Sequence, residues 1–262
     1  MDSQRLKGKR AIVTGAGSGI GRASAIRFAS EGAQVVVVGR RQEKIDETVA
    51  LIGQGGGSAM AIAADAAIEA NVKTIIARCI EVFGGLEVFF ANAAYTEPAP
   101  AYLFDQTVEL WTETMRVNVI SCFLAAKHAG LHMREHGGGS IIFTSSVASL
   151  RGNGGDSCYS ASKAAVNSLA RGAACEMAGT NVRVNAVLPG LIETDGTKDM
   201  IDAARARGVE HKLGRVNPLK RIGQANEIAA MAAFLASDDS SYVNGQCYAV
   251  DGGVSASHPG KF

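Results

Sequence analysis

A tyrosine and a lysine that could act together stand in the segment Tyr159-Ser160-Ala161-Ser162-Lys163. In a helix their spacing places both side chains on one face, one turn apart. A phenol can give or take a proton, and a neighbouring ammonium group stabilises the phenolate and lowers the tyrosine pKa. Ser146 lies 13 residues before the tyrosine and offers a hydroxyl group that can orient a substrate oxygen. Because a Tyr-x-x-x-Lys spacing also arises by chance, its meaning depends on the rest of the chain.

A glycine-rich segment near the start of the chain is the second candidate site. It reads Thr14-Gly15-Ala16-Gly17-Ser18-Gly19-Ile20-Gly21, with the spacing TGxxxGxG rather than the commoner GxGxxG. Glycines let the backbone turn tightly and approach a pyrophosphate, and a following helix offers free N–H groups and the positive end of its dipole. The alternative is a strand-to-helix turn that binds nothing. The apolar run before the glycines and the helical pattern after them favour a dinucleotide cofactor.

The residues after the second apolar run bear on which cofactor is bound. In dinucleotide-binding sheets an acid at this position usually binds the ribose 2′-hydroxyl of NAD. Here the run ends in Val38-Gly39-Arg40-Arg41, and the first acid is Glu43. Arg40 and Arg41 could pair with a 2′-phosphate, so NADP(H) is favoured and NAD(H) remains possible. In the alternative interpretation both arginines are solvated loop residues, and Ser18 adds no basic group in the glycine loop.

Apolar runs alternate with helical patterns along the whole chain. Strands are expected at 10–14, 34–38, 58–63, 86–90, 140–144, 181–188 and 246–250. Helices are expected at 20–30, 43–52, 69–82, 104–136 (one or two helices), 159–177 and 226–236. This alternation predicts an α/β fold, a doubly wound, Rossmann-like parallel sheet with helices on both faces. Ligands of such sheets bind beyond the carboxyl ends of the strands, and Ser146 directly follows one strand.

Composition limits the other classes of function. No linker divides the 262 residues, so a single domain over 1–262 is expected. The net charge of +1 and the lack of a basic stripe argue against nucleic-acid or membrane partners. The five cysteines are odd in number and form no CxxC pair, which argues against a disulfide framework or metal site. With no secretory leader or spanning segment, a cytoplasmic location is expected.

Taken together, these segments resemble the short-chain dehydrogenase/reductase family, in its short single-domain form and nearly from end to end. The residues that carry the resemblance are TGAGSGIG at 14–21, Asp65, Ala91-Asn92-Ala93-Ala94, Asn118, Ser146, Tyr159, Lys163, Pro189-Gly190-Leu191-Ile192-Glu193-Thr194 and Asp251-Gly252-Gly253. The resemblance implies an oxidoreductase that moves a hydride between a nicotinamide cofactor and a ketone or secondary alcohol.

The resemblance also assigns roles. Tyr159 is expected to act as general acid and base, Ser146 to orient the substrate oxygen, Lys163 to hold the nicotinamide ribose, and Asn118 to hold a proton-supplying water. Asp65 is expected at the adenine amino group, Asn92 beside the adenosine ribose, and Ile192 with Thr194 at the carboxamide. The cofactor-binding set is expected to be Gly15, Gly17, Ser18, Gly19, Ile20, Gly21, Arg40, Arg41, Asp65, Asn92, Ala93, Tyr159, Lys163, Pro189, Gly190, Ile192 and Thr194.

Two positions depart from the family pattern. The usual Asn-Asn-Ala-Gly reads Ala91-Asn92-Ala93-Ala94, so a methyl group at Ala94 could crowd the cofactor or shift the substrate loop. Ala66 follows Asp65 where a larger apolar residue is usual, which could loosen the packing around adenine. Neither change removes a reacting group.

The substrate and the assembly are less defined. Residues 191–221 resemble a substrate lid, and the substrate is expected to meet Tyr95, Ser146, Val147, Asn153, Tyr159 and Leu191. These side chains favour a small, mostly apolar carbonyl or alcohol. The family also implies a homotetramer packed through the helices at 107–128 and 159–177. Two alternatives are a catalytically inactive nucleotide-binding regulator and a lyase or epimerase; the intact Ser146, Tyr159 and Lys163 set argues against the first.

Overall fold

Seven parallel strands form the central sheet of the chain. The computed structural model describes residues 4–96, 102–152, 155–214 and 217–257. The strand order is β3-β2-β1-β4-β5-β6-β9, with every neighbouring pair parallel. The bounds are β1 Arg10–Thr14, β2 Gln34–Gly39, β3 Ser58–Ala63, β4 Val88–Ala91, β5 Gly139–Thr144, β6 Val182–Pro189 and β9 Cys247–Val250. The predicted doubly wound fold is confirmed, and the order reverses between β1 and β4, where such sheets bind ligands.

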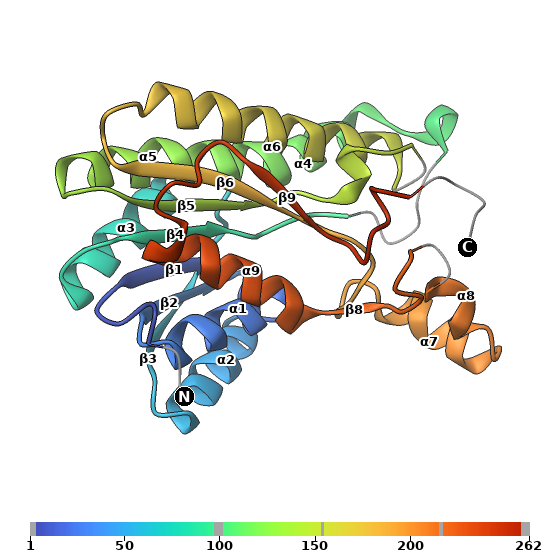
Figure 1. Ribbon diagram of the computed structural model, residues 1–262, viewed down its shortest axis with the longest axis horizontal. Helices are drawn as coiled ribbons and strands as arrows, with labels where there is room; N and C mark the ends of the chain where they lie inside the picture. Colours follow the sequence, from blue (N-terminus) through green and yellow to red (C-terminus); the bar gives the residue numbers. More distant parts are fainter. Residues whose placement is uncertain (1–3, 97–101, 153–154, 215–216, 258–262) are drawn as a thin grey trace.

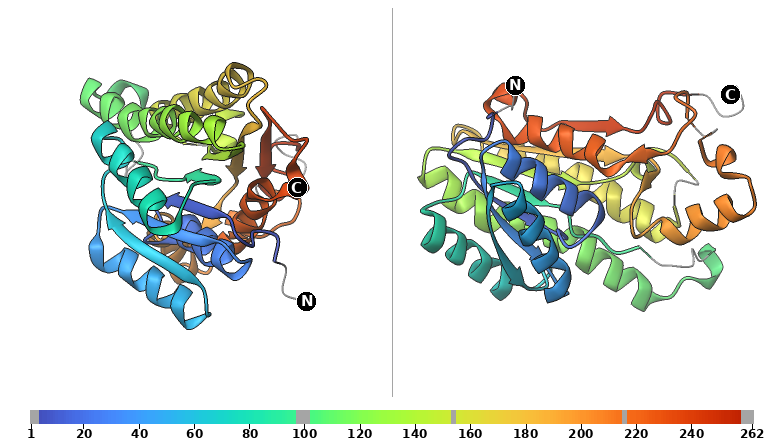
Figure 2. Two further views of the ribbon diagram at one scale, coloured as in Figure 1. Left: turned by 90° about the vertical axis from the view of Figure 1, so that its left-hand side faces the viewer. Right: turned by 90° about the horizontal axis from the view of Figure 1, so that it is seen from below.

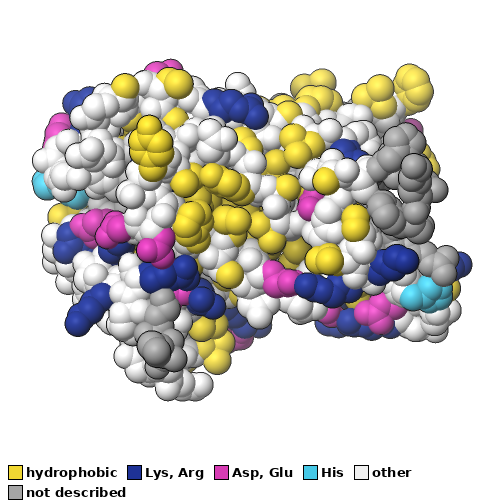
Figure 3. Space-filling model, in the orientation of Figure 1, with side chains coloured by type: hydrophobic (Ala, Val, Ile, Leu, Met, Phe, Trp, Pro, Cys, Tyr) yellow, Lys and Arg dark blue, Asp and Glu magenta, His cyan; other side chains and the backbone are white. Residues whose placement is uncertain are grey.

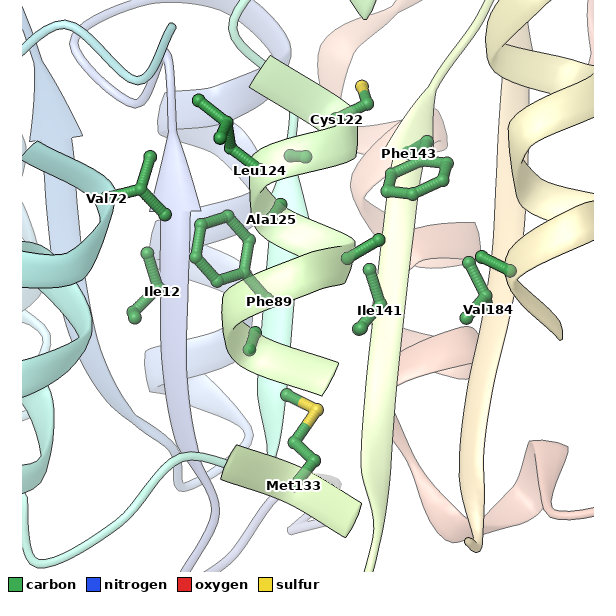
Figure 4. Packing of buried hydrophobic residues seen from close by; sticks show 14 of the residues in the cluster. Ile12, Val72, Phe89, Cys122, Leu124, Ala125, Met133, Ile141, Phe143 and Val184 are labelled. Carbon is green, nitrogen blue, oxygen red and sulfur yellow. The ribbon is translucent and has the colours of Figure 1, made fainter. Parts of the chain in front are cut away.

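Helices cover both faces of the sheet (Figure 1). Helices α3 (Glu69–Phe83), α5 (Ser121–Glu135) and α6 (Ser157–Glu176) cover one face, with α4 (Val108–Met115) beside α6. Helices α1 (Gly19–Ser30), α2 (Gln42–Gln54) and α9 (Ala225–Ala236) cover the other. Side chains along each strand alternate between the two cores. In Figure 4, Phe89 of β4 and Phe143 of β5 lie among α5 side chains such as Leu124. Burial on both faces explains why the strands are almost continuously apolar.

The expected helical region at 104–136 is interrupted. A 3-10 turn, Leu103–Asp105, precedes α4, and a π-helical turn, Arg116–Ile120, joins α4 to α5. Single π-helical turns are rare and occur often at functional sites. This turn carries Asn118, one of the expected site residues.

A small substructure lies at the end of the sheet toward which the strand arrows point. It contains α7 (Lys198–Ala206), α8 (Glu210–Gly214) and the strands β7 (Ile192–Glu193) and β8 (Gly223–Gln224), which pair with each other. Figures 1 and 2 show α7 and α8 projecting beyond the sheet at this end. The described residues of the segment expected to form a lid therefore lie at the carboxyl edge of the sheet.

The surface carries charges of both signs. On the face in Figure 3, basic and acidic side chains are interspersed around apolar ones. Within the described residues, no helix is long and apolar enough to cross a membrane.

Candidate active site

The glycine loop between β1 and α1 is shaped by close backbone contacts. Gly15 has a φ of 65°, a conformation that favours glycine. A Cβ atom built on Gly21 would lie 2.2 Å from the carbonyl oxygen of Gly15, so only glycine allows α1 to pack against the loop. Ser18 precedes α1 but makes no side-chain capping bond, so the first N–H groups of α1 stay available to a ligand.

Arg22 braces this loop from α1. Its Nη2 atom donates hydrogen bonds to the carbonyl oxygen of Gly17 at 2.5 Å and to a Glu47 carboxylate oxygen at 2.8 Å. Its Nε atom donates to Thr48 Oγ1 at 3.1 Å. The loop is thus tied to α2 by a side chain that the motif analysis did not single out.

A cleft of about 690 Å³ runs along the carboxyl ends of the strands, from the glycine loop to the Tyr159 side chain. Its lining includes almost all the expected cofactor residues: Gly15, Gly17, Ser18, Gly19, Ile20, Arg40, Arg41, Asp65, Asn92, Ala93, Tyr159, Lys163, Pro189, Gly190, Ile192 and Thr194. Of that set only Gly21 is missing, because it serves the helix–loop contact just described. Residues from widely separated parts of the sequence therefore share one cavity.

Tyr159, Lys163 and Ser146 come together at one end of this cleft. Tyr159 lies in the first turn of α6, whose N-cap Asp156 accepts a hydrogen bond from the Tyr159 backbone N–H at 2.7 Å. The Lys163 ammonium nitrogen lies 5.6 Å from the centre of the Tyr159 ring. Ser146 follows β5, and its hydroxyl oxygen accepts a hydrogen bond from the Ala148 N–H at 3.1 Å. The three residues that the sequence analysis grouped by their spacing thus lie at the same end of one cleft.

Burial is the largest influence on the pKa of both Tyr159 and Lys163. It raises the pKa of Tyr159 above the usual value; the Asp156 charge also raises it, and a hydrogen bond with Ser146 lowers it. For the protein groups alone, desolvation of the phenolate outweighs the hydrogen bond from Ser146, so Lys163 by itself does not bring the tyrosine pKa below its usual value. The lowering expected from Lys163 together with a cationic nicotinamide remains a prediction for the cofactor-bound enzyme. Burial also lowers the pKa of Lys163 to about 8.

Asn118 lies outside the cleft lining, fully buried in the π-helical turn. Its Oδ1 atom accepts a hydrogen bond from the Tyr95 N–H at 2.7 Å, and its Nδ2 atom donates to the Tyr95 carbonyl at 3.0 Å. Nδ2 also donates to Ser162 Oγ at 3.0 Å, and Ser162 donates to the Tyr159 carbonyl at 2.7 Å. Asn118 therefore joins the loop after β4 to the helix that carries Tyr159.

The end of the cleft at Asp65 is charged. One Asp65 oxygen accepts a hydrogen bond from the Ala67 N–H at 2.8 Å, and the other accepts from Arg116 Nη1 at 2.9 Å. These bonds, with the nearby charge of Arg40, lower the pKa of Asp65 despite its partial burial. Arg40 and Arg41 are exposed and line the cleft, and neither forms an ion pair within the described residues.

Only some of the residues expected to contact the substrate line the cleft. Ser146 and Tyr159 line the cleft, whereas Val147 and Tyr95 do not. Leu191 lines a neighbouring cavity of about 460 Å³, against the loop 251–253. Asn153 lies outside the described residues.

Other lining residues lie outside the expected cofactor and substrate sets, although Thr14 begins the glycine-rich motif and Ala94 was expected to crowd the cofactor. They are Thr14, Lys44, Ile45, Ala94, Thr96, Val117, Thr144, Ser145, Asp195, Gly196 and Thr197 among others. Several directly precede or follow an identified motif, which is the one signal that could have indicated them. Lys44 and Val117 belong to helical segments, so only the packing of α2 and of the π-helical turn places them at the cleft.

Comparisons with known proteins agree with this geometry. A family profile described as "Enoyl-(Acyl carrier protein) reductase" matches residues 15–255. Levodione reductase of Leifsonia aquatica is 36% identical over 265 residues, covering 97% of each chain. A crystal structure of levodione reductase superposes with a TM-score of 0.91 at 35% identity, covering 97% of this chain and 100% of the other.

Two further solved structures carry cofactors. A 7α-hydroxysteroid dehydrogenase complexed with NADH and 7-oxo glycochenodeoxycholic acid has a TM-score of 0.88 at 35% identity, covering 96% of each chain. A putative NAD(P)-dependent gluconate 5-dehydrogenase from Beutenbergia cavernae, with bound NADP, has a TM-score of 0.88 at 35% identity, covering 97% of this chain and 99% of the other. The chain is an NAD(P)-dependent oxidoreductase that moves a hydride between its cofactor and a ketone or alcohol, and it belongs to the short-chain dehydrogenase/reductase family.

Proposed function

We propose that this enzyme interconverts a small, mostly apolar ketone and its secondary alcohol, prefers NADP(H), and uses Tyr159 as the general acid and base. The observation that carries the proposal is the single cleft that holds Tyr159, Lys163 and Ser146 together with the glycine loop. The chemistry of these groups matches proton transfer to and from a substrate oxygen.

The cleft fits a nicotinamide dinucleotide. The uncapped start of α1 offers N–H groups to a pyrophosphate, and Gly15 and Gly19 adopt positive φ angles that bring the backbone close to the cavity. Asp65 would hold the adenine end, and Lys163 would hold the nicotinamide ribose. When bound, the cofactor supplies or accepts the hydride.

The protein groups favour a protonated Tyr159 near neutral pH, because burial raises the pKa of its phenol. In the reducing direction Tyr159 would donate its proton to the substrate oxygen, which Ser146 orients by a hydrogen bond. Lys163 has a pKa of about 8, so its ammonium form predominates at neutral pH and stabilises the phenolate left behind. Asn118 would have two roles: it would fix the backbone around Tyr159 through Ser162, and it would hold the expected proton-supplying water.

The preference for NADP(H) rests on Arg40 and Arg41. Both side chains are exposed at the cleft and unpaired within the described residues, so both are free to meet a 2′-phosphate. Similar solved structures carry NADH in one case and NADP in another, so likeness to them does not decide the preference.

The test measures oxidation of NADPH and NADH in parallel with a β-ketoester, a cyclic diketone, levodione and a 7-oxo bile acid. We expect a NADPH preference of tenfold or more, about 1.4 kcal/mol. A preference for NADH would mean that Arg40 and Arg41 are surface charges only. Tight cofactor binding without turnover of any ketone would favour a regulatory protein.

We further propose that the lid lies over the substrate and that the enzyme forms homotetramers. Within 191–221, the described residues, including α7 and α8, occupy the carboxyl edge of the sheet, where a lid would act. On α5 and the turn before it, Ile120, Phe123 and Leu131 form an exposed apolar stripe on the face turned away from the sheet. A second copy packed against this stripe would bury it.

A cytoplasmic location is proposed from the cysteines. All five are free, and Cys79, Cys122 and Cys158 are buried. Unpaired thiols suit a reducing compartment.

A further inference from the structure

A buried asparagine lies one helical turn beyond Lys163 and has no place in the proposed chemistry. Asn167 is 4% exposed, and its Nδ2 atom donates a 2.7 Å hydrogen bond to the hydroxyl oxygen of Ser149. Its Oδ1 atom is buried without a hydrogen-bond partner among the described residues. An unsatisfied buried acceptor costs about 1–3 kcal/mol, so the asparagine is a poor choice for stability alone.

Ser149 connects this asparagine to Ser146. The Ser149 hydroxyl donates to the carbonyl oxygen of Ser146 at 2.5 Å, and the Ser149 N–H donates to the same oxygen at 3.0 Å. Because Asn167 already points an N–H at the Ser149 oxygen, the hydroxyl proton is directed toward Ser146. The path Asn167–Ser149–Ser146 therefore runs from the core of α6 to the serine at the cleft.

We propose that Asn167, acting through Ser149, is a positioning residue that fixes the backbone of Ser146 and so aims its hydroxyl at the substrate oxygen and at Tyr159. The inference rests on the proposed role of Ser146 and Tyr159. It explains why a half-satisfied amide occupies a buried helix position: the site gains orientation at a cost in stability, as functional sites often do.

The ionisation of Tyr159 reports on this arrangement without any substrate. The hydrogen bond from Ser146 lowers the tyrosine pKa, so a displaced Ser146 would let it rise. Among the described residues, the charged groups around the phenol are Lys163 on α6 and Asp156 at its N-cap, and the substitutions below alter neither. The phenolate signal of Tyr159 is isolated by subtracting the ultraviolet titration of the same variant carrying Tyr159→Phe.

The experiment compares Ser149→Ala and Asn167→Leu with wild type, each titrated with saturating oxidised cofactor. We expect a higher ionisation midpoint for Tyr159 in both variants, and a kcat reduced on the order of tenfold, less than the roughly hundredfold for a 1 Å misplacement. Since the two residues act in series, the double variant should shift no further than the single ones. Ser149→Thr keeps the hydroxyl and should titrate like wild type.

Two controls separate positioning from general destabilisation. Ser168→Ala removes an exposed serine from the same helix and should change nothing. Asn185→Leu removes a buried asparagine of β6 that is hydrogen-bonded to the Val243 carbonyl and the Gln246 N–H, in the segment before β9. This substitution should lower Tm without moving the Tyr159 midpoint. Asn167→Leu should keep most of its Tm, because it also removes the unsatisfied oxygen.

An unchanged Tyr159 midpoint in both Ser149→Ala and Asn167→Leu overturns the inference, whatever their activity. A midpoint that rises supports it even if no tested ketone is turned over, in which case the proposed function fails separately.

Discussion

The ammonium nitrogen of Lys163 donates a 2.8 Å hydrogen bond to the carbonyl oxygen of Thr144, the last residue of β5. This bond fixes the lysine at the carboxyl end of a central strand, where its side chain is 1% exposed. An ammonium group carries three donors, so two remain for the proposed contacts with a cofactor ribose and a water. The same contact explains how a buried cation is tolerated beside Tyr159.

Substituting Tyr159→Phe removes the proposed proton donor and keeps the ring. We expect turnover to fall by about 10²- to 10⁴-fold, the usual contribution of general acid–base catalysis, while cofactor affinity stays within a few-fold of wild type. Steady-state rates and fluorescence titration of NADPH measure the two quantities. Retention of most activity would contradict the mechanism.

The buried Lys163 makes stability depend on pH. Its pKa in the folded chain is about 8, below the ordinary lysine value of 10.5, so between these values the unfolded chain binds more protons than the folded one. Stability conferred by this site therefore rises with pH across that window, and below about pH 8 the whole cost of burying the charge is present. Denaturant unfolding at neutral pH and at about pH 9 should show wild type gaining stability relative to Lys163→Met. A difference that stays constant with pH would contradict the buried-charge interpretation.

Removing both arginines after β2 tests cofactor choice. We expect Arg40→Ala with Arg41→Ala to weaken NADPH binding by about tenfold or more, since a charge-assisted hydrogen bond contributes about 1.5–3 kcal/mol, and to leave NADH binding nearly unchanged. Arg78→Ala on α3, which removes an exposed arginine paired with Glu81, is the matched control. Equal losses for both cofactors would argue against a 2′-phosphate contact.

Asp65 should behave differently from the arginines. Adenine is common to both cofactors, so Asp65→Asn should weaken NADPH and NADH binding by similar factors, about fivefold for a loss of about 1 kcal/mol. The substitution also removes the charge opposite Arg116. Calorimetric titration with each cofactor measures the factors, and a loss confined to NADPH would assign the effect to Arg40, whose charge acts on Asp65.

A substitution in the apolar stripe on α5 tests the proposed homotetramer. Phe123→Glu places a charge in the proposed interface and should shift the species in solution from tetramer toward dimer or monomer, as measured by light scattering coupled to size-exclusion chromatography. Val82→Glu on α3 changes a side chain of similar exposure (47% against 43%) and should leave the mass unchanged. A wild-type monomer would overturn the proposal directly.

The sequence by itself determined the motifs and the strands and long helices of the main sheet, but it did not predict α7, α8, β7 and β8. The strands predicted at 10–14 and 58–63 coincide with β1 and β3, and most other boundaries differ by one or two residues. Local rules are sufficient here, because burial on both faces makes each strand apolar and glycines end the helices. The expected cofactor-binding residues apart from Gly21 line one cleft, because many of them follow strands at fixed places in a parallel sheet.

Only the tertiary structure decided which side chains meet. Asp65 and Arg116 are 51 positions apart, and their ion pair depends on β3 and the π-helical turn lying at the same edge of the sheet. The path from Asn167 through Ser149 to Ser146 depends on how α6 packs beside the loop after β5. The tertiary structure also decided that the protein groups raise the pKa of Tyr159 rather than lower it. The sequence shows the neighbouring lysine, whereas desolvation arises from every element packed around the phenol.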